Sequence, residues 1–293
     1  MFNKFQELID LSNKTGKLLH EVIMEWEMLE NGTDPKELIK TSEKLVTQMI
    51  ESYREKMQDH SNSLTGWTGF NTHLYKKHID NNKSFFNNII SKGILASFAT
   101  SENNASMGRI VACPTAGSSG VIPGVFIALY EEKNIEIEKL AEGLIVASAV
   151  GEFIRRKASL SGAVGGCQAE IGSAISMGAA ALSYISTKNN DNVVNSASLA
   201  LKFIMGLICD PVGGFVEIPC VKRNPAGTVL AFTAAEMACA GIKSAIPFDE
   251  VITAMGKVGR IMHEDLKETG KGGVANTSTA KKMLLEFSSN KKI

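Results

Sequence analysis

The sequence predicts a single, mainly α-helical domain, and three observations lead to this fold class. Apolar residues recur at helical spacing through most long stretches of the chain. Aromatic residues make up only 6% of the 293 residues, whereas Gly (26) and Met (12) are plentiful, which favours closely packed helices over a β-sandwich. Alternation with a period of two is limited to short pieces around 109–113 and 215–218. Because no internal repeat or low-complexity linker divides the chain, we expect residues 1–293 to form one domain.

The first part of the chain, 1–58, contains two predicted helices. Apolar residues recur at helical spacing within 3–30, and this pattern ends near Asn31 and Gly32. Pro35 directly follows Asp34, as in the first turn of a helix, so a second helix is expected to run to about residue 58. Each helix is polar on one face, which makes 1–58 a candidate arm or partner surface. The alternative is an ordinary helical hairpin on the domain surface.

The rest of the chain alternates between loops and helices. Residues 59–72 show no apolar period and are expected to form a loop, and 81–84 have the composition of a turn. Further helices are expected at 85–98, 136–157, 168–186, 191–207, 227–243 and 248–266.

Composition and charge exclude several classes of partner. Lys and Arg (31) balance Asp and Glu (31), whereas binding to nucleic acid or to an anionic membrane would favour a basic excess. The first ten residues carry charges where a signal peptide would have its apolar core. The apolar runs at 120–130 and 227–247 are too short, or too interrupted by charge, to span a bilayer. We therefore expect a cytoplasmic protein whose five cysteines are reduced thiols or metal ligands.

Three cysteines stand out because each lies beside Gly or Pro. Cys167 follows Gly-Ala-Val-Gly-Gly, Cys209 begins Cys-Asp-Pro-Val-Gly-Gly, and Cys220 ends Ile-Pro-Cys. Glycine lets backbone approach a bulky inorganic group and proline restricts the loop, whereas a cysteine used only for packing needs neither neighbour. The chain contains no Cys-x-x-Cys, which excludes ferredoxin-type runs and zinc ribbons. Three cysteines from separate loops can still bind an iron–sulfur cubane and leave one iron open.

The other two cysteines are interpreted differently. Cys239, in Ala-Ala-Glu-Met-Ala-Cys-Ala-Gly, fits a structural core residue. Cys113 also lies in a Gly/Pro-rich loop, and the residues alone leave open whether it belongs to the ligand set.

A second unusual segment, 106–124, is a candidate substrate cradle, and we call it the cradle segment. Thr115, Ser118 and Ser119 offer hydroxyls, while Gly117 and Gly120 allow close backbone approach at a predicted helix N-terminus. Such a terminus favours a carboxylate. The alternative is a helix cap preceded by a turn.

The polar residues after Cys220 have two interpretations. Lys222, Arg223 and Asn224 could bind the substrate carboxylate or form hydrogen bonds to a cluster. They could equally form a solvated loop face.

The candidates for a general base by residue type are His60, His73, His78 and His263, although single histidines are more often structural.

These segments resemble the iron–sulfur-dependent L-serine dehydratases. The resemblance lies in Gly-Ala-Val-Gly-Gly-Cys-Gln-Ala-Glu, Cys-Asp-Pro-Val-Gly-Gly and Ile-Pro-Cys-Val-Lys-Arg-Asn, in the run from Ser106 to Gly120, and in Lys271-Gly-Gly-Val-Ala. It extends over essentially the whole chain. It implies a largely helical catalytic domain in which Cys167, Cys209 and Cys220 bind a 4Fe-4S cluster. It also implies a place in amino-acid degradation and gluconeogenesis.

Two departures from the family pattern carry their own expectations. Single-chain members have an additional N-terminal α/β domain, so this chain resembles the alpha subunit of the two-chain type, whose beta subunit supplies the missing part. In the family, a Ser-Ser-Ser-His-Thr motif in the beta portion carries a histidine implicated in catalysis, so we expect an active site completed across the subunit interface. Some members use a C-terminal cysteine as a resting cluster ligand, and this chain has none after Cys239.

The expected reaction converts L-serine to pyruvate and ammonia. An open iron would act as a Lewis acid on the substrate hydroxyl and carboxylate. A pyridoxal enzyme would instead need a lysine Schiff base, and no such motif stands out. The alternatives are a related lyase acting on L-cysteine or L-threonine and a non-catalytic, cluster-binding regulatory subunit. The polar cradle segment argues against the regulatory subunit, because sensing requires no amino-acid pocket.

Overall fold

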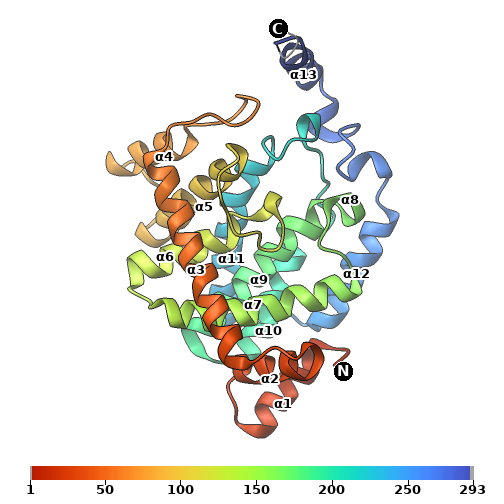
Figure 1. The fold of residues 1–293 in the computed structure, drawn as a ribbon. Coiled ribbons are helices and arrows are strands. Elements are labelled where there is room, and N and C mark those ends of the chain that lie inside the picture. Colours follow the sequence, from red (N-terminus) through yellow and green to blue (C-terminus); the bar gives the residue numbers. More distant parts are fainter. Residues whose placement is uncertain (1, 291–293) are drawn as a thin grey trace.

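A computed structural model describes residues 2–290, and its regular elements form one helical domain (Figure 1). Within these residues no strand forms, and the only β-type pairing is an isolated bridge between Cys209 and Lys267. The predicted mainly α fold is thereby confirmed. The longer helices are α1 (Phe5–Thr15), α2 (Leu19–Asn31), α3 (Pro35–Gln58), α4 (Asn71–Asp80), α5 (Asn88–Ala105), α6 (Val121–Lys133), α7 (Ile137–Lys157), α9 (Ser173–Thr187), α10 (Asn190–Phe203), α11 (Cys220–Cys239), α12 (Phe248–Ile261) and α13 (Ser278–Asn290).

Helix α9 is the centre of the domain. Every residue from Ser173 to Tyr184 is buried, and the helix packs against α6, α7, α10 and α11. A helix with apolar and small residues on all sides has no solvent face and is stable only when other helices surround it. Gly178 faces α11, where a β-carbon would make an ordinary contact of 3.5 Å with that of Ala231. The small side chains of α9 therefore permit the close packing that the composition predicts.

The N-terminal helices pack onto this body. Helix α3 contacts α5 and α7, while α1 contacts α12. Phe5 has no exposed surface and stacks edge-on against Phe153 and Phe248, and Trp26 lies against Phe153. The apolar side of 1–58 is thus continuous with the main core. Its use as a partner surface stays a prediction.

A second, smaller core lies near the C-terminus. Val212, Ala275 and Ala280 are buried together, with Trp67 packed against them. The Trp67 and Phe215 rings lie 5.8 Å apart, and both contact Phe287 of α13. Figure 1 shows α13 projecting from the main body at this end. This cluster joins the 59–72 loop to the loop between Cys209 and Cys220.

Several predicted boundaries were wrong. The helix expected over 3–30 is two helices, separated at Gly16, which adopts a left-handed φ of 72°. The helix expected over 227–243 begins at Cys220, because Asn224 in its polar first turns is held by tertiary hydrogen bonds to the Gly117 and Gly120 backbone. The helix expected over 248–266 ends at Ile261. Helices α4 and α13 were not predicted, α6 was expected only as a helix N-terminus near Gly120, and the alternating pieces at 109–113 and 215–218 are irregular loops.

Candidate active site

Three segments that lie far apart in sequence bring Cys167, Cys209 and Cys220 together. Cys167 follows the short helix α8 (Gly162–Gly165), Cys209 lies in the loop after α10, and Cys220 is the first residue of α11. Their exposed fractions are only 2%, 2% and 7%. The thiols of Cys167 and Cys209 form a hydrogen bond, and Cys220 interacts electrostatically with Cys167. The three predicted ligands therefore lie in one buried place.

Two glycines make room for this arrangement. A β-carbon at Gly162 would lie 2.8 Å from the Cys209 sulfur, which real contacts do not allow. Gly166 has a φ of +76°, and a β-carbon there would lie 2.9 Å from the Leu207 carbonyl. The Gly-rich sequence before Cys167 thus serves close packing and a left-handed turn.

Arg223 supplies a positive charge beside Cys167. Its Nη2 donates to Asp210 Oδ1 at 2.8 Å, and its Nη1 donates to the Ile208 carbonyl at 3.1 Å. The hydrogen bond with Cys209 lowers the pKa of Cys167, and Arg223 lowers it further, against the effect of burial. The same Cys167 contact raises the pKa of Cys209, and burial raises the pKa of Cys220 to about 12. Cys167 is therefore the thiol that loses its proton most readily, as metal binding requires.

Lys222 and Arg223 have different surroundings. Lys222 is exposed on the first turn of α11, whereas Arg223 is half-buried and directed towards Cys167 and Asp210. The two interpretations of this polar run therefore separate by residue: the solvated face fits Lys222, and a role beside the cysteines fits Arg223.

Asn224 connects the cradle segment to Cys220. It is 1% exposed, and its Oδ1 accepts from the backbone amide of Gly120 at 2.9 Å. Its Nδ2 donates to the carbonyls of Gly117 (2.8 Å) and Cys220 (2.9 Å). Both amide hydrogens are thus used within the protein, which favours a positioning role. Contact between Asn224 and a substrate stays a prediction.

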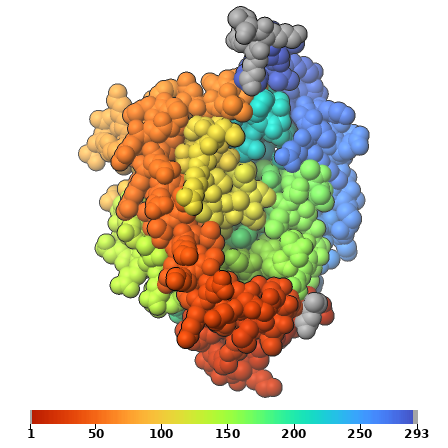
Figure 2. Space-filling model, in the orientation of Figure 1, coloured from red at the N-terminus to blue at the C-terminus, as the bar shows by residue number. Residues whose placement is uncertain are grey.

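The predicted hydroxyls of the cradle segment gather on one turn (Ala116–Ser118) before α6. Thr115 is half-buried, and its hydroxyl lies 3.0 Å from that of Ser118, which has no exposed surface. The Ser119 hydroxyl donates to the Ala116 carbonyl at 2.8 Å and is also fully buried. Figure 2 shows the cradle segment, in yellow, at the surface between the 50–75 and 155–170 segments. Thr115 is therefore the best placed of the three hydroxyls to meet a ligand.

Glu170 is the residue that sequence reasoning missed. It lies on a π-type turn (Gln168–Gly172), its carboxylate is 3.8 Å from the Cys209 sulfur, and it forms a hydrogen bond with Thr115. Burial raises its pKa. Glu170 follows Cys167 by three residues, which would place the two on one side of a helical turn, and this spacing was the available signal.

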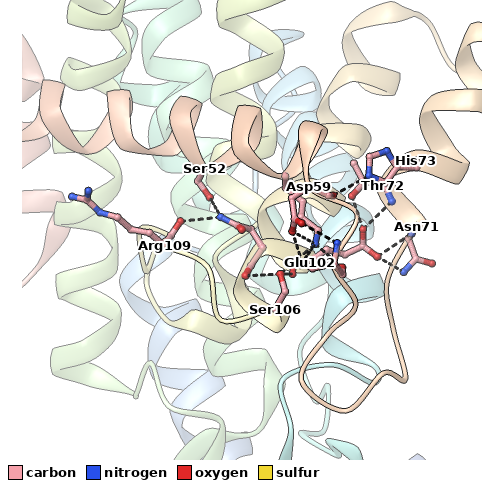
Figure 3. A network of polar contacts seen from close by, with 11 residues as sticks. Ser52, Asp59, Asn71, Thr72, His73, Glu102, Ser106 and Arg109 are labelled. Atoms are coloured by element: carbon pink, nitrogen blue, oxygen red, sulfur yellow. Dashed lines mark hydrogen bonds and ion pairs between the residues drawn. The ribbon is translucent and has the colours of Figure 1, made fainter.

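Buried polar groups hold the start of the cradle segment (Figure 3). Lys56 is 1% exposed, and its Nζ donates to Ser106 Oγ at 3.2 Å and to Asp59 Oδ2 at 3.0 Å. Asn103 Nδ2 donates to the Arg109 carbonyl and to Ser52 Oγ, both at 3.0 Å. Glu102, also 1% exposed, accepts hydrogen bonds at the first turn of α4, from Thr72 among others. Buried hydrogen bonds therefore fix the first residues of the cradle segment, from Ser106 to Arg109.

None of the four candidate histidines contacts the cysteines or the cradle hydroxyls in the part of the chain that the structure describes. The His60 and His73 rings are stacked 3.9 Å apart, and His73 Nε2 lies 3.1 Å from the Asp59 carbonyl. His78 stacks on Tyr75, and His263 is 70% exposed beside Asp265. The arrangement around the cysteines therefore offers no histidine base from residues 2–290.

The remaining cysteines lie outside the three-cysteine site. Cys113 is buried, its thiol is directed at the carbonyls of Val111 and Ser119, and burial raises its pKa to about 12. Cys239 is exposed at the last turn of α11, so the prediction that it is a core residue was wrong. Its neighbours Ala235 and Ala238 take the buried positions. Residues 291–293, the end of the tail without a resting cysteine ligand, lie outside the described residues.

The donor set fits an iron–sulfur cluster in its chemistry. The three cysteines are free thiols in a mostly buried site, next to a guanidinium that favours thiolate. Among residues 2–290, no group of three or more His, Cys, Asp or Glu side chains is gathered closely enough for a single metal ion. A cubane is wider than one ion, since each thiolate binds a different iron, so this spacing does not conflict with the predicted cofactor.

The fold and site define a helical protein in which three buried cysteines lie beside a polar, hydroxyl-lined turn. A sequence profile of the serine dehydratase alpha chain family matches residues 14–275. The chain therefore belongs to the serine dehydratase alpha chain family.

Individual relatives agree with this assignment. The chain is 37% identical over 288 residues to the L-serine dehydratase alpha chain of Peptoniphilus asaccharolyticus, a match that covers 98% of each protein. It is 40% identical over 289 residues to the probable L-serine dehydratase alpha chain of Bacillus subtilis, covering 97% of this chain and 94% of the relative. An L-serine dehydratase of Helicobacter pylori is 33% identical over 94% of this chain, which spans 62% of that protein.

The helices offer no candidate for a membrane span, since none in residues 2–290 combines the necessary length with sufficient apolar character.

Proposed function

We propose that this chain is the alpha subunit of an L-serine dehydratase, an ammonia-lyase that converts L-serine to pyruvate and ammonia. The observation that carries the proposal is the meeting of three buried cysteines with the Thr115 hydroxyl around Glu170. The names and coverage of the relatives support the same reaction. Loss of water from L-serine leaves 2-aminoacrylate, which tautomerises to an imine, and addition of water then releases ammonia and pyruvate.

We propose further that Cys167, Cys209 and Cys220 hold a 4Fe-4S cluster. When bound, such a cluster would supply a Lewis acid for the departing hydroxyl. The protein's own contribution is to keep the three thiols dry and to favour thiolate through Arg223. Arg223 is itself held by Asp210, a carboxylate that is only 2% exposed.

The cradle segment would orient the substrate next to the cysteines. The Thr115 hydroxyl can donate to a substrate carboxylate, with Ser118 behind it to fix its position. Asn224 holds the Gly117 and Gly120 backbone against Cys220, so the cradle and the cysteine site move as one unit. Binding a substrate in a preset orientation is a large part of what a site contributes to rate.

A partner chain would complete the site. The relatives' designation as alpha chains supports a second subunit, and the histidines of residues 2–290 lie away from the cysteines. We therefore propose that the base that removes the Cα proton comes from a beta subunit. Full activity of this chain alone, with its cofactor intact, would refute that part of the proposal.

The test is an anaerobic preparation of this chain together with its partner, assayed for pyruvate from L-serine, L-threonine and L-cysteine. We expect L-serine to be the preferred substrate, with iron and sulfide present in the protein. The variant with Cys167, Cys209 and Cys220 all replaced by Ser should be inactive, whereas Cys239→Ser should match the wild type. Turnover by the triple variant, or an absorption spectrum of a pyridoxal aldimine, would show that another chemistry operates.

A further inference from the structure

Glu170 occupies the point where the cysteine site and the cradle segment meet. Its carboxylate lies 3.8 Å from the Cys209 sulfur and forms a hydrogen bond with Thr115. Two glycines border it: β-carbons at Gly162 and Gly117 would lie 2.9 Å and 3.4 Å from Glu170 Oε2. The absence of side chains at both positions leaves space directly beside this carboxylate.

The carboxylate has no cationic partner. No ion pair among residues 2–290 includes Glu170. The basic residue of this site, Arg223, is instead paired with Asp210. The charged side chain that acts on Glu170 is that of Glu268, which is also an anion and raises the pKa of Glu170. Removing a carboxylate from water without a compensating cation is unfavourable, and such groups are normally paired. The site therefore has a place for a positive charge that the protein itself does not fill.

A turn of π type positions this group. Residues Gln168–Gly172 form one wide turn between Cys167 and α9, and Gln168 anchors it by donating to the carbonyls of Gly165 (2.9 Å) and Met255 (3.1 Å). Such turns are uncommon within helices and occur frequently at functional sites. The turn places Glu170 beside Thr115 and Cys209.

An amino-acid substrate carries one positive charge, its α-ammonium group. We infer that Glu170 binds the substrate α-ammonium, and that the Thr115 hydroxyl, which has one proton to donate, then donates it to the substrate carboxylate in place of Glu170. This inference depends on the proposed function and deepens it, because Glu170 would select amino acids over hydroxy acids of the same shape. A charge-assisted hydrogen bond at a site sheltered from water is strong enough for that selection.

The test compares two ligands that differ only at this group and have no leaving group at C3. L-alanine has the α-ammonium, and L-lactate has a hydroxyl in its place. Their binding to the reconstituted complex of both chains is measured by calorimetry, for the wild type and for Glu170→Gln, together with iron and sulfide content. The Glu170→Gln side chain keeps its size and can still accept a hydrogen bond from Thr115, but it loses the charge.

We expect Glu170→Gln to weaken L-alanine binding roughly ten- to a hundredfold and L-lactate binding less than about twofold. The KM for L-serine should rise by a similar factor as L-alanine binding weakens. Glu170→Asp should recover part of the loss, because the charge remains on a shorter side chain. Glu268→Gln is the matched control: it removes a neighbouring carboxylate with no hydrogen bond to Thr115, and it should weaken L-alanine binding much less than Glu170→Gln does.

If Glu170→Gln weakened the binding of L-alanine and of L-lactate equally, or changed neither affinity, the assignment of Glu170 to the α-ammonium group would be overturned. Loss of iron and sulfide from Glu170→Gln would also overturn it, since Glu170 would then act by supporting Cys209. The proposed function is tested separately by wild-type turnover of L-serine, so its failure is distinguishable from failure of this inference.

Discussion

The carboxylate of Asp210 accepts a hydrogen bond of 2.8 Å from Arg223 Nη2 and so keeps the guanidinium next to Cys167. The other carboxylate oxygen accepts from the Val274 amide at 2.8 Å. A single buried group thus connects the cysteine site to the loop before α13. Gly273 allows this contact, because it has a φ of +57° and a β-carbon there would lie 2.2 Å from Asp210 Oδ2.

Replacing Asp210 should therefore weaken both connections. We expect Asp210→Ala to lower the free energy of unfolding by about 2–4 kcal/mol, since it leaves a partly buried arginine unpaired, and some solvent access to that arginine limits the loss. Urea unfolding of the full chain measures this difference. Asp80→Ala, which breaks an exposed pair with Lys76, serves as the control and should change stability by less than about 1 kcal/mol. Equal effects of the two substitutions would contradict the structural role of Asp210.

The cysteines should differ in their effect on cofactor content. We expect Cys167→Ser, Cys209→Ser and Cys220→Ser each to reduce iron and sulfide strongly after anaerobic reconstitution, because each removes a proposed thiolate ligand. Cys113→Ser and Cys239→Ser should retain both elements, since neither thiol lies with the other three. Chemical analysis of iron and sulfide, with visible absorption, provides the measurement. A loss from Cys113→Ser that is not explained by unfolding would add Cys113 to the ligand set.

Asn224 should act mainly through the backbone it holds. Asn224→Ala leaves the Gly120 amide without its acceptor and the Gly117 carbonyl without its side-chain donor, both in a buried place. We expect a loss of about 2–3 kcal/mol in stability, measured by thermal or urea unfolding. The kcat for L-serine should fall together with it, as the cradle shifts relative to the cysteines. A raised KM with unchanged stability and kcat would instead favour the direct substrate contact that the sequence predicts.

Stability should also depend on pH through His20. This residue is 8% exposed and hydrogen-bonds with Tyr184, and burial lowers its pKa from the ordinary value of 6.5. The unfolded chain therefore binds the proton more readily, so the contribution of His20 is complete above pH 6.5 and decreases as the pH falls towards the folded-state pKa. We expect His20→Gln, which does not titrate, to show a smaller decrease in Tm between about pH 7.5 and about pH 5.

The control for this experiment is His263→Gln. His263 is 70% exposed, so its replacement should leave the pH dependence of Tm as in the wild type. If His20→Gln and the wild type lost stability in parallel as the pH fell, the buried His20–Tyr184 pair would not be the group responsible.

Several helices could not be placed from sequence for identifiable reasons. Helix α6 is buried on all sides from Val121 to Leu129, so it has no polar face and therefore no apolar period. The start of α11 contains Pro225 and polar residues that indicate a loop. Tertiary hydrogen bonds between Asn224 and the Gly117 and Gly120 backbone hold these turns in helical form despite the local sequence. Cys239, interpreted as a core residue, falls on the exposed side of the same helix, because the register of α11 directs Ala235 and Ala238 inwards.

By itself, the sequence determined the helical fold class, the three cysteines beside Gly and Pro, and the hydroxyls of the cradle segment. These features are local, because helical periodicity and turn residues depend on neighbours within a few positions along the chain. Only the tertiary structure decided that Arg223 lies beside Cys167 and that Glu170 lies between Cys209 and Thr115. Such contacts join segments separated by tens of residues, and their formation depends on the packing of α9 and α11 against the cradle turn and not on any local pattern.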